Sequence, residues 1–295
     1  MAVGFTPDTV NENPYISVAE YKNAPTALSL STLVVNGNQN AQDAELAAVI
    51  LRASSYMNEY LNQNLVADQY TQTQRIRFSQ SSGYFALHPN IAPVISLSSF
   101  EYGSNPNALY ALADCSKAWF EGQQIIIPNP LLGFNWSSQG PLAFGSVSPT
   151  GWTFTKYTYV AGFVNTTMES ASDGDTSLTV VDPTGILPGQ RYRIADGSKS
   201  EWVTVSDSYT YGSATVEITS PLVFAHEAGA TFYNMPNALK QACILITSAF
   251  IKMRGDTSTT MQYTTNPSGN IAGATRYGGD IAVALDMVNK YRRIR

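Results

Sequence analysis

The sequence has few charged residues for its length. Asp, Glu, Lys and Arg make up 13% of the 295 residues, whereas ordinary soluble chains contain roughly 25%. Asn, Ser, Thr, Gln and Tyr occupy the polar positions instead. Such a surface forms few ion pairs and offers hydroxyl and amide groups. These groups suit permanent, hydrogen-bonded contacts with other subunits, although extracellular β proteins share the bias.

The sequence also lacks a long hydrophobic run and a secretion signal. No segment approaches the roughly 18 apolar residues of a membrane-spanning helix, and Met1 to Gly4 has neither a basic n-region nor an apolar h-region. We therefore expect no membrane partner and a protein that is made and kept in a cytoplasm, or released by lysis. The two cysteines, Cys115 and Cys243, are expected to be buried thiols, with Cys243 packed in the core.

Residues that would indicate catalysis or metal binding are scarce. His226 lies in an Ala-His-Glu-Ala-Gly segment without the second histidine of a zinc-binding helix, so we interpret it as a turn residue. The Asp-Gly-Asp at 173–175 lacks the other acids of a calcium loop. Glu101 and Glu121 fit solvated strand edges better than a glycosidase pair. With no hydrolase elbow, phosphate loop or dinucleotide fingerprint, we expect no enzymatic activity, no metal and no cofactor.

The formal net charge of −5 argues against a nucleic-acid-binding surface over the whole protein. Four of the 17 basic residues nevertheless lie within the last six positions: Lys290, Arg292, Arg293 and Arg295. Cations at a helix C-terminus complement the helix dipole, and a cationic cluster can also bind a partner. Both interpretations stay open from the sequence.

Two segments far apart in the sequence have the spacing of amphipathic helices. The first is Asp43 to Leu61, with Asn40 as its expected N-cap, and the second is Asn237 to Met253, with Pro236 expected in its first turn. The two apolar stripes consist of Leu46, Ile50, Ala53, Met57 and Tyr60, and of Leu239, Cys243, Ile246, Phe250 and Met253. Because nearly everything between them is typical of β-structure, these helices have to meet to bury their stripes.

Two shorter helices are expected at the ends. Ser17 and Glu20 form a capping box that starts a helix near Val18, and this helix should stop before Pro25. The last helix runs from Gly279 to Tyr291 and carries an apolar face of Ile281, Ala284, Leu285 and Val288.

The middle of the sequence has alternating patterns and turn residues that predict strands. Expected strands lie at 73–78, 94–102, 109–120, 124–127 and 152–160. Residues 166–233 contain five more, at 177–181, 192–194, 201–205, 215–218 and 231–233, which we interpret as an inserted antiparallel module, sandwich-like or barrel-like. The predicted fold class is α+β, with a helical bundle from both ends. The predicted domains are a core formed by 1–165 and 234–295, with the helices of both ends, and the inserted module at 166–233.

Two parts of the sequence resemble a known family. The first is Tyr-Ile-Ser-Val-Ala-Glu-Tyr at 15–21 with the alanine-rich helix at 43–60, and the second is Met-Pro-Asn-Ala-Leu-Lys-Gln-Ala at 235–242, continuing to Lys-Met-Arg at 252–254 and to the terminal Lys-Tyr-Arg-Arg. These segments, roughly half of the chain, resemble bacteriophage head-tail connector (adaptor) proteins. Known adaptors are mainly helical bundles, and this chain departs from them in its long β middle and its 166–233 module.

The resemblance implies a ring, usually of twelve copies, that docks beneath the portal and continues the DNA channel toward the tail. Its implied partners are further copies of the chain, the portal protein, the next neck or tail protein, and genomic DNA that passes without sequence-specific binding. It implies a place in the virion at the head-tail junction, with assembly in the host cytoplasm, and contact with the portal through Lys290, Arg292, Arg293 and Arg295. A ring requires a head-to-tail interface whose rotation closes.

A second class of function is compatible with the composition. A β-rich receptor-binding or carbohydrate-binding virion protein would use exposed aromatic residues, for which the candidates are Trp136, Trp152, Tyr209 and Tyr211. Aromatic residues at turns and strands are more often part of the core. The matched helical ends favour the connector.

Overall fold

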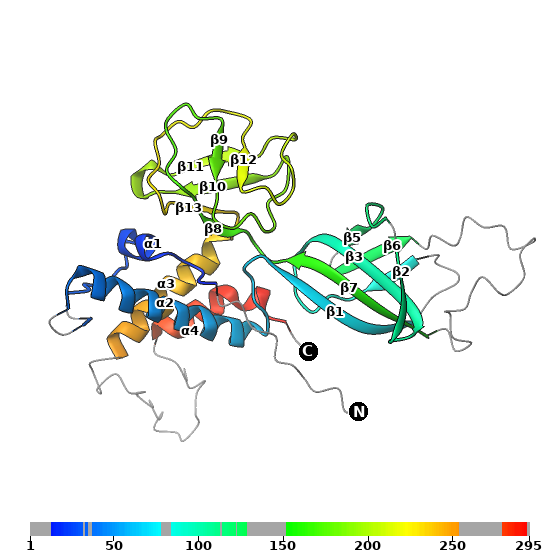
Figure 1. The fold of residues 1–295 in the computed structure, drawn as a ribbon. Coiled ribbons are helices and arrows are strands. Elements are labelled where there is room, and N and C mark those ends of the chain that lie inside the picture. The colour runs from blue at the N-terminus through cyan, green and yellow to red at the C-terminus, as the bar shows by residue number, and fades with distance from the viewer. Residues whose placement is uncertain are drawn as a thin grey trace, which may run out of the picture. The chain divides into compact units, whose positions relative to one another are not determined.

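The computed structural model describes residues 13–31, 33–34, 37–77, 84–112, 114–121, 123–128, 152–253 and 279–293. They have the predicted α+β architecture, with helices toward both ends and a β-rich middle (Figure 1). The chain divides into two compact units. Unit 1 combines residues 1–66 with 164–295, and unit 2 consists of residues 67–163. No helix among the described residues is long and apolar enough to cross a membrane.

The described part of unit 1 has four α-helices: α1 (Val18–Asn23), α2 (Gln39–Leu61), α3 (Asn237–Met253) and α4 (Gly279–Val288), which continues into the 3-10 turn η5 (Asn289–Tyr291). The predicted capping box of α1 is confirmed, because Ser17 Oγ accepts from Glu20 N at 3.1 Å and Glu20 Oε2 accepts from Ser17 N at 3.0 Å. Helices α2, α3 and α4 pack together as predicted (Figure 1).

Helix α2 begins at Gln39, earlier than the predicted Asp43. Its N-cap is Asn38 rather than Asn40, since the Asn38 side chain accepts from Ala41 N at 2.9 Å. The first turn of α2 is polar, so its sequence shows no apolar periodicity that would predict a helix. It is held by tertiary contacts, in which buried Gln42 donates to Val34 O at 2.9 Å and accepts from Val34 N at 2.8 Å.

The predicted bounds of α3 are confirmed, and three residues of its stripe, Leu239, Cys243 and Ile246, are fully buried. Phe250 is only half-buried and contacts Tyr56 edge-to-face at 5.8 Å. Pro236 lies just before the helix, one position outside the predicted first turn. Its carbonyl accepts from Lys240 N at 3.4 Å, which is the place of an N-cap.

The other two predicted stripes have similar outcomes. In α2 the buried stripe is Leu46, Ile50, Ala53, Met57 and Leu61, whereas Tyr60 is half-buried. In α4 the predicted face of Ile281, Ala284, Leu285 and Val288 is buried. The side chain of Met253 lies outside the described residues.

The described residues of unit 2 form two antiparallel sheets. One has the strand order β1-β7-β3-β4, and the other has the order β2-β6-β5. The strands are β1 (Asp68–Arg77), β2 (Tyr84–Leu87), β3 (Val94–Asn105), β4 (Ala108–Ala111), β5 (Trp119–Glu121), β6 (Gln124–Pro128) and β7 (Trp152–Ala161). Both sheets contribute to a core of Ile76, Phe85, Leu87, Phe100, Ile125, Ile127, Tyr157, Tyr159 and Ala161.

In unit 2 one predicted strand was wrong and one strand was missed. The strand expected at 109–120 is interrupted, because β4 pairs with β3 while β5 pairs with β6 in the other sheet. Strand β2 has only four residues and was not predicted, although Phe85 and Leu87 alternate into the core. A strand this short gives too few positions for the period of two to stand out.

The segment predicted as the inserted module contains six strands rather than five. They are β8 (Asn165–Thr167), β9 (Ser177–Thr179), β10 (Arg191–Ala195), β11 (Glu201–Thr204), β12 (Thr215–Glu217) and β13 (Thr231–Tyr233), with the 3-10 turn η3 (Gly197–Lys199). They form a sheet of order β11-β10-β13-β8 and the pair β12-β9. The bridges Met168↔Val180 and Val205↔Ile218 join the two, so the strands close around one core.

The ends of this module lie together. Val164 N donates to Asn234 Oδ1 at 2.8 Å, and Asn234 N donates to Val164 O at 3.1 Å. The module belongs to the same compact unit as the helices, and the division inside the predicted 1–165 domain falls between Val66 and Ala67. Contacts between the module and α1 and α3, described below, account for this grouping.

Candidate functional site

The predicted portal contact lies at the end of the chain. Lys290, Arg292 and Arg293 are described, and Arg295 lies outside the described residues. The Lys290 ammonium stands 4.8 Å from the centre of the Tyr291 ring, and the Arg292 guanidinium stands 4.9 Å from the centre of the Tyr60 ring. Both cationic side chains are exposed, so these stacking contacts fix their position and leave their charge on the surface.

The backbone of this segment closes the C-terminus of α2. Arg293 N donates to Leu61 O at 2.9 Å, and Asn62 Nδ2 donates to Arg293 O at 3.1 Å. Gln63 Nε2 donates to Tyr291 O at 2.8 Å. The cations therefore lie at the negative end of the α2 dipole, which is consistent with the dipole interpretation and does not exclude a partner.

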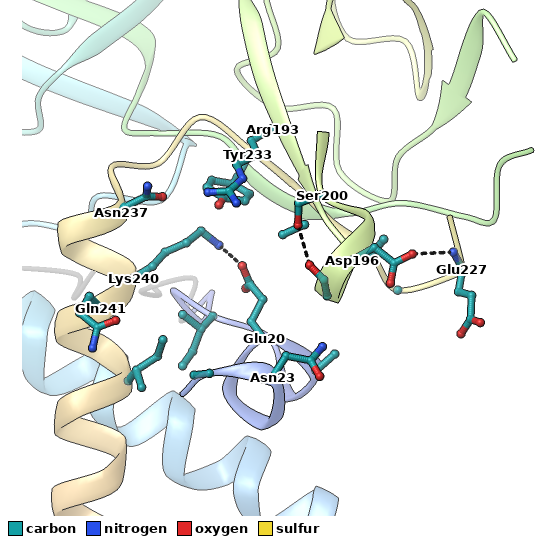
Figure 2. A pocket seen from close by; sticks show the side chains of 18 of the residues that line it. Glu20, Asn23, Arg193, Asp196, Ser200, Glu227, Tyr233, Asn237, Lys240 and Gln241 are labelled. Carbon is teal, nitrogen blue, oxygen red and sulfur yellow. Dashed lines mark hydrogen bonds and ion pairs between the residues drawn. The ribbon is translucent and has the colours of Figure 1, made fainter. Parts of the chain in front are cut away.

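A second candidate site is a groove of about 550 Å³ within unit 1, which we call the Arg193 groove (Figure 2). Its walls come from α1, from α3, and from β10, η3 and β13 of the module. Lys240 reaches into it from α3, Glu20 from α1 and Arg193 from β10 (Figure 2). Sequence reasoning did not find this site, because its residues lie in three distant segments.

Lys240 is buried at the inner end of the groove, and its ammonium has several partners. Lys240 Nζ donates to Glu20 Oε1 and to Asn165 Oδ1, both at 2.8 Å. It also lies 3.4 Å from Tyr15 O and 3.9 Å from the centre of the Tyr233 ring. Burial lowers the pKa of Lys240, and the neighbouring Glu20 carboxylate opposes that shift. The ammonium thus joins α3 to α1 and to two strands of the module.

Arg193 and Tyr233 lie on paired strands beside Lys240. Burial raises the pKa of Tyr233, while its hydrogen bond with Arg193 acts in the opposite direction. Among the residues that the structure describes, Arg193 has no ion-pair partner. Its guanidinium shares the lining of the groove with the carboxylates of Glu20, Asp196 and Glu227.

His226 is not an ordinary turn residue, and that prediction was wrong. Its side chain is fully buried, with Nε2 2.9 Å from Glu201 Oε1 and Nδ1 3.4 Å from Asp196 Oδ2. Burial alone would raise the pKa of Glu201, but N–H donation from Val223 and the His226 ring bring it below its ordinary value. The two carboxylates contact different nitrogens of the imidazole. No cluster in the described parts of the chain is arranged to hold a metal ion.

The remaining sequence candidates fall in different places. Cys243 is buried as predicted, whereas Cys115 is only half-buried, and both thiols are free. Tyr209, expected among exposed aromatic residues, is buried and donates to Ser213 O at 2.8 Å. Tyr211 is exposed. Trp136 and the side chain of Trp152 lie outside the described residues.

No protein-family model and no curated protein matches the sequence. Among solved structures, the chain is similar to one described as "Neck of empty GTA particle computed with C6 symmetry". The match has 13% identity and a TM-score of 0.39, and it covers 95% of this chain and 90% of that chain. A similarity of this degree does not define the function of this chain.

Proposed function

We propose that this protein is a structural head-tail connector (adaptor) of a tailed bacteriophage. The observation that carries the proposal is that α2 packs against α3 and α4, although the whole β middle separates them in the sequence. A basic segment also closes the C-terminus of α2. These are the two parts of the sequence that resemble adaptor proteins. The proposal gives the protein a place at the head-tail junction of the virion and assigns it no catalytic activity.

In this proposal, copies form a ring, usually of twelve in the family, beneath the portal. The low charged content suits large permanent contacts between subunits. The net charge of −5 would let DNA pass through the ring with little counterion-release binding. The next neck or tail protein would bind the opposite side of the ring.

Lys290, Arg292, Arg293 and Arg295 would face the portal. The exposed cations of Lys290 and Arg292 are held over aromatic rings, which lowers the entropy that they lose on binding. Arginine forms directional, charge-assisted hydrogen bonds with carboxylates, so an acidic portal rim would fix the orientation of the ring.

The test is a mass measurement of the purified protein, alone and with its portal protein, followed by gold labelling of virions with an antibody against this chain. We expect a complex with many copies of the chain on each portal ring, and label at the head-tail junction. Label at the tail tip would favour the receptor-binding alternative. Absence of both the complex and junctional label would overturn the proposal.

A further inference from the structure

The last described segment of the chain, residues 289–293, lies against the C-terminal end of α2. Helix α4 ends at Val288, where the chain tightens into the 3-10 turn η5. The exposed cation of Arg292 follows directly after this turn. Three side chains at the end of α2 contact the segment, and we call them the α2 platform: Tyr60, Asn62 and Gln63.

Tyr60 holds Arg292 in two ways. The Arg292 guanidinium stands 4.9 Å from the centre of the Tyr60 ring, and the Tyr60 hydroxyl donates to Asn289 Oδ1 at 3.2 Å. Arg292 N in turn donates to Asn289 O at 3.0 Å, so Asn289 links the backbone of Arg292 to the ring that its side chain contacts. No ion pair among the described residues holds this guanidinium. The contact with Tyr60 therefore fixes the direction of the charge.

Asn62 holds the backbone that carries Arg292. It ends α2 in the left-handed region, with φ 56° and ψ 26°, which asparagine adopts more readily than most residues other than glycine. From this position Asn62 Nδ2 donates to Arg293 O at 3.1 Å. Gln63 Nε2 adds a bond to Tyr291 O at 2.8 Å. The backbone on both sides of Arg292 is therefore bound to the end of α2.

These contacts exceed what the dipole of α2 requires. A cation complements a helix dipole anywhere near the last turn, and its orientation matters little. A guanidinium that binds a carboxylate through two parallel N–H bonds must instead present its plane in one direction. A side chain that is oriented before binding also loses less entropy when the partner binds. The support of Arg292 by Tyr60 and Asn62 fits the second task.

We propose that the α2 platform positions Arg292 for the portal contact, with Tyr60 and Asn62 as positioning residues. Tyr60 fixes the direction of the guanidinium, and Asn62 fixes the backbone that carries it. The inference rests on the proposed function, because it names the residues that orient one cation of that contact. Both residues act through Arg292 and not by touching the portal.

The first test measures the order of the Arg292 side chain without the portal. In full-length protein with isotope-labelled arginine, nuclear magnetic relaxation of the Arg292 Nε–H bond gives an order parameter. We expect Tyr60→Leu and Asn62→Gly to lower it to the range of flexible groups, below about 0.6. Exposed Tyr211→Leu is the control and should leave it unchanged. A variant that keeps the wild-type value would exclude its residue as a positioning residue.

Asn62→Gly is the matched variant that spares the end of α2. Glycine adopts the left-handed conformation without strain, so the helix still ends in the same way and only the bond to Arg293 O is lost. Because Asn62 is exposed, this variant decides the same tests if Tyr60→Leu fails to fold.

The second test measures the affinity for purified portal rings at equilibrium. Tyr60→Leu should raise the Kd about fivefold, the size expected when one long side chain has to be ordered on binding. Asn62→Gly should raise it as well. Tyr60→Phe keeps the ring and should change the Kd by less than about twofold. Equal losses in Tyr60→Phe and Tyr60→Leu would overturn the role of the ring.

A double-mutant cycle separates positioning from a general structural effect. In an Arg292→Ser background, Tyr60→Leu should cause no further loss of affinity, because no guanidinium remains to be oriented. Losses that add would show that Tyr60 acts independently of Arg292, and they would overturn the inference.

The two proposals fail separately. A wild-type protein that does not bind portal rings refutes the portal contact, while the order parameters still decide whether the α2 platform orients Arg292. A protein that binds portal rings equally well with and without Tyr60 and Asn62 refutes the positioning and leaves the connector function intact.

Discussion

Glu20 and Lys240 are 220 residues apart in the sequence, yet Lys240 Nζ lies 2.8 Å from Glu20 Oε1. The other carboxylate oxygen of Glu20 accepts from Ser17 N in the capping box. One side chain therefore both starts α1 and neutralises the buried ammonium of α3.

Replacement of Glu20 by Gln should destabilise the protein by about 3 kcal/mol, because it leaves the buried Lys240 ammonium without its counter-charge. Gln at this position can still complete the capping box, so the loss reports on the ion pair. Urea denaturation measures the free energy of unfolding. The double variant Glu20→Gln/Lys240→Met should lose less than Glu20→Gln alone, and exposed Glu227→Gln serves as the control. If Glu20→Gln is as stable as the wild type, water solvates the Lys240 ammonium well enough without a counter-charge.

Removal of residues 165–233 and closure with a short Gly-Ser linker should leave a helical protein only when Lys240 is also changed to Met. The ends of the module are joined by hydrogen bonds between Val164 and Asn234, so a short linker can span them. The deletion removes Asn165 and Tyr233, so the Lys240 ammonium loses two of its partners. Thermal melting followed by circular dichroism at 222 nm compares the deletion with and without Lys240→Met. If the two deletion variants melt at the same temperature, the contacts of Lys240 are not what makes the helices depend on the module.

Ile50→Asp should be more damaging than Phe250→Asp. Ile50 is 1% exposed in the centre of α2, and an unpaired buried carboxylate costs several kcal/mol or becomes protonated. Phe250 is half-buried against Tyr56, so an aspartate there can reach water. We expect Ile50→Asp to abolish the cooperative unfolding transition and Phe250→Asp to lower stability by about 1–2 kcal/mol. Equal losses would mean that the two stripes are buried alike.

The two thiols should differ in reactivity and in their effect on the pH dependence of stability. Burial raises the pKa of Cys243 to about 11 from 9.0, so the folded protein holds this proton where the unfolded chain releases it. Stability from this group is complete below pH 9 and decreases as the pH rises toward 11, by about 1 kcal/mol between pH 8 and 10.

The measurement is the free energy of unfolding of wild type and Cys243→Ala at both pH values. The gap between the two proteins should narrow at pH 10, whereas Cys115→Ala should follow the wild type more closely. A thiol reagent should label half-buried Cys115 first. Rapid labelling of Cys243 in the folded protein would contradict its burial.

Changing Arg292, Arg293 and Arg295 to Ser should leave the monomer folded but weaken its joining to DNA-filled heads. The effect should increase with salt, because ionic strength screens the contacts that remain. Electron microscopy of tailless heads incubated with wild type or variant counts the occupied vertices. If wild type and variant occupy the same number of vertices across a salt series, these residues only close the C-terminus of α2. In that case the variant should lose only a small part of its stability.

Local sequence signals determined much of the secondary structure. The capping box of α1, the bounds of α3 and the apolar face of α4 were predicted because each depends on residues within a few turns of one helix. The start of α2 was missed because Gln42 is held by Val34 through a contact that has no periodic pattern. Strand β2 and the break between β4 and β5 depend on which sheet each strand joins.

Only the tertiary structure revealed the buried polar clusters around Lys240 and His226. Lys240 gave no sign of its partners in the sequence, since Glu20, Asn165 and Tyr233 come from three separate segments. His226 was interpreted as a turn residue because its carboxylate partners, Asp196 and Glu201, lie 30 and 25 residues away. A helix stripe repeats along the chain and can be read there, whereas a buried polar cluster is satisfied only once distant segments are packed together.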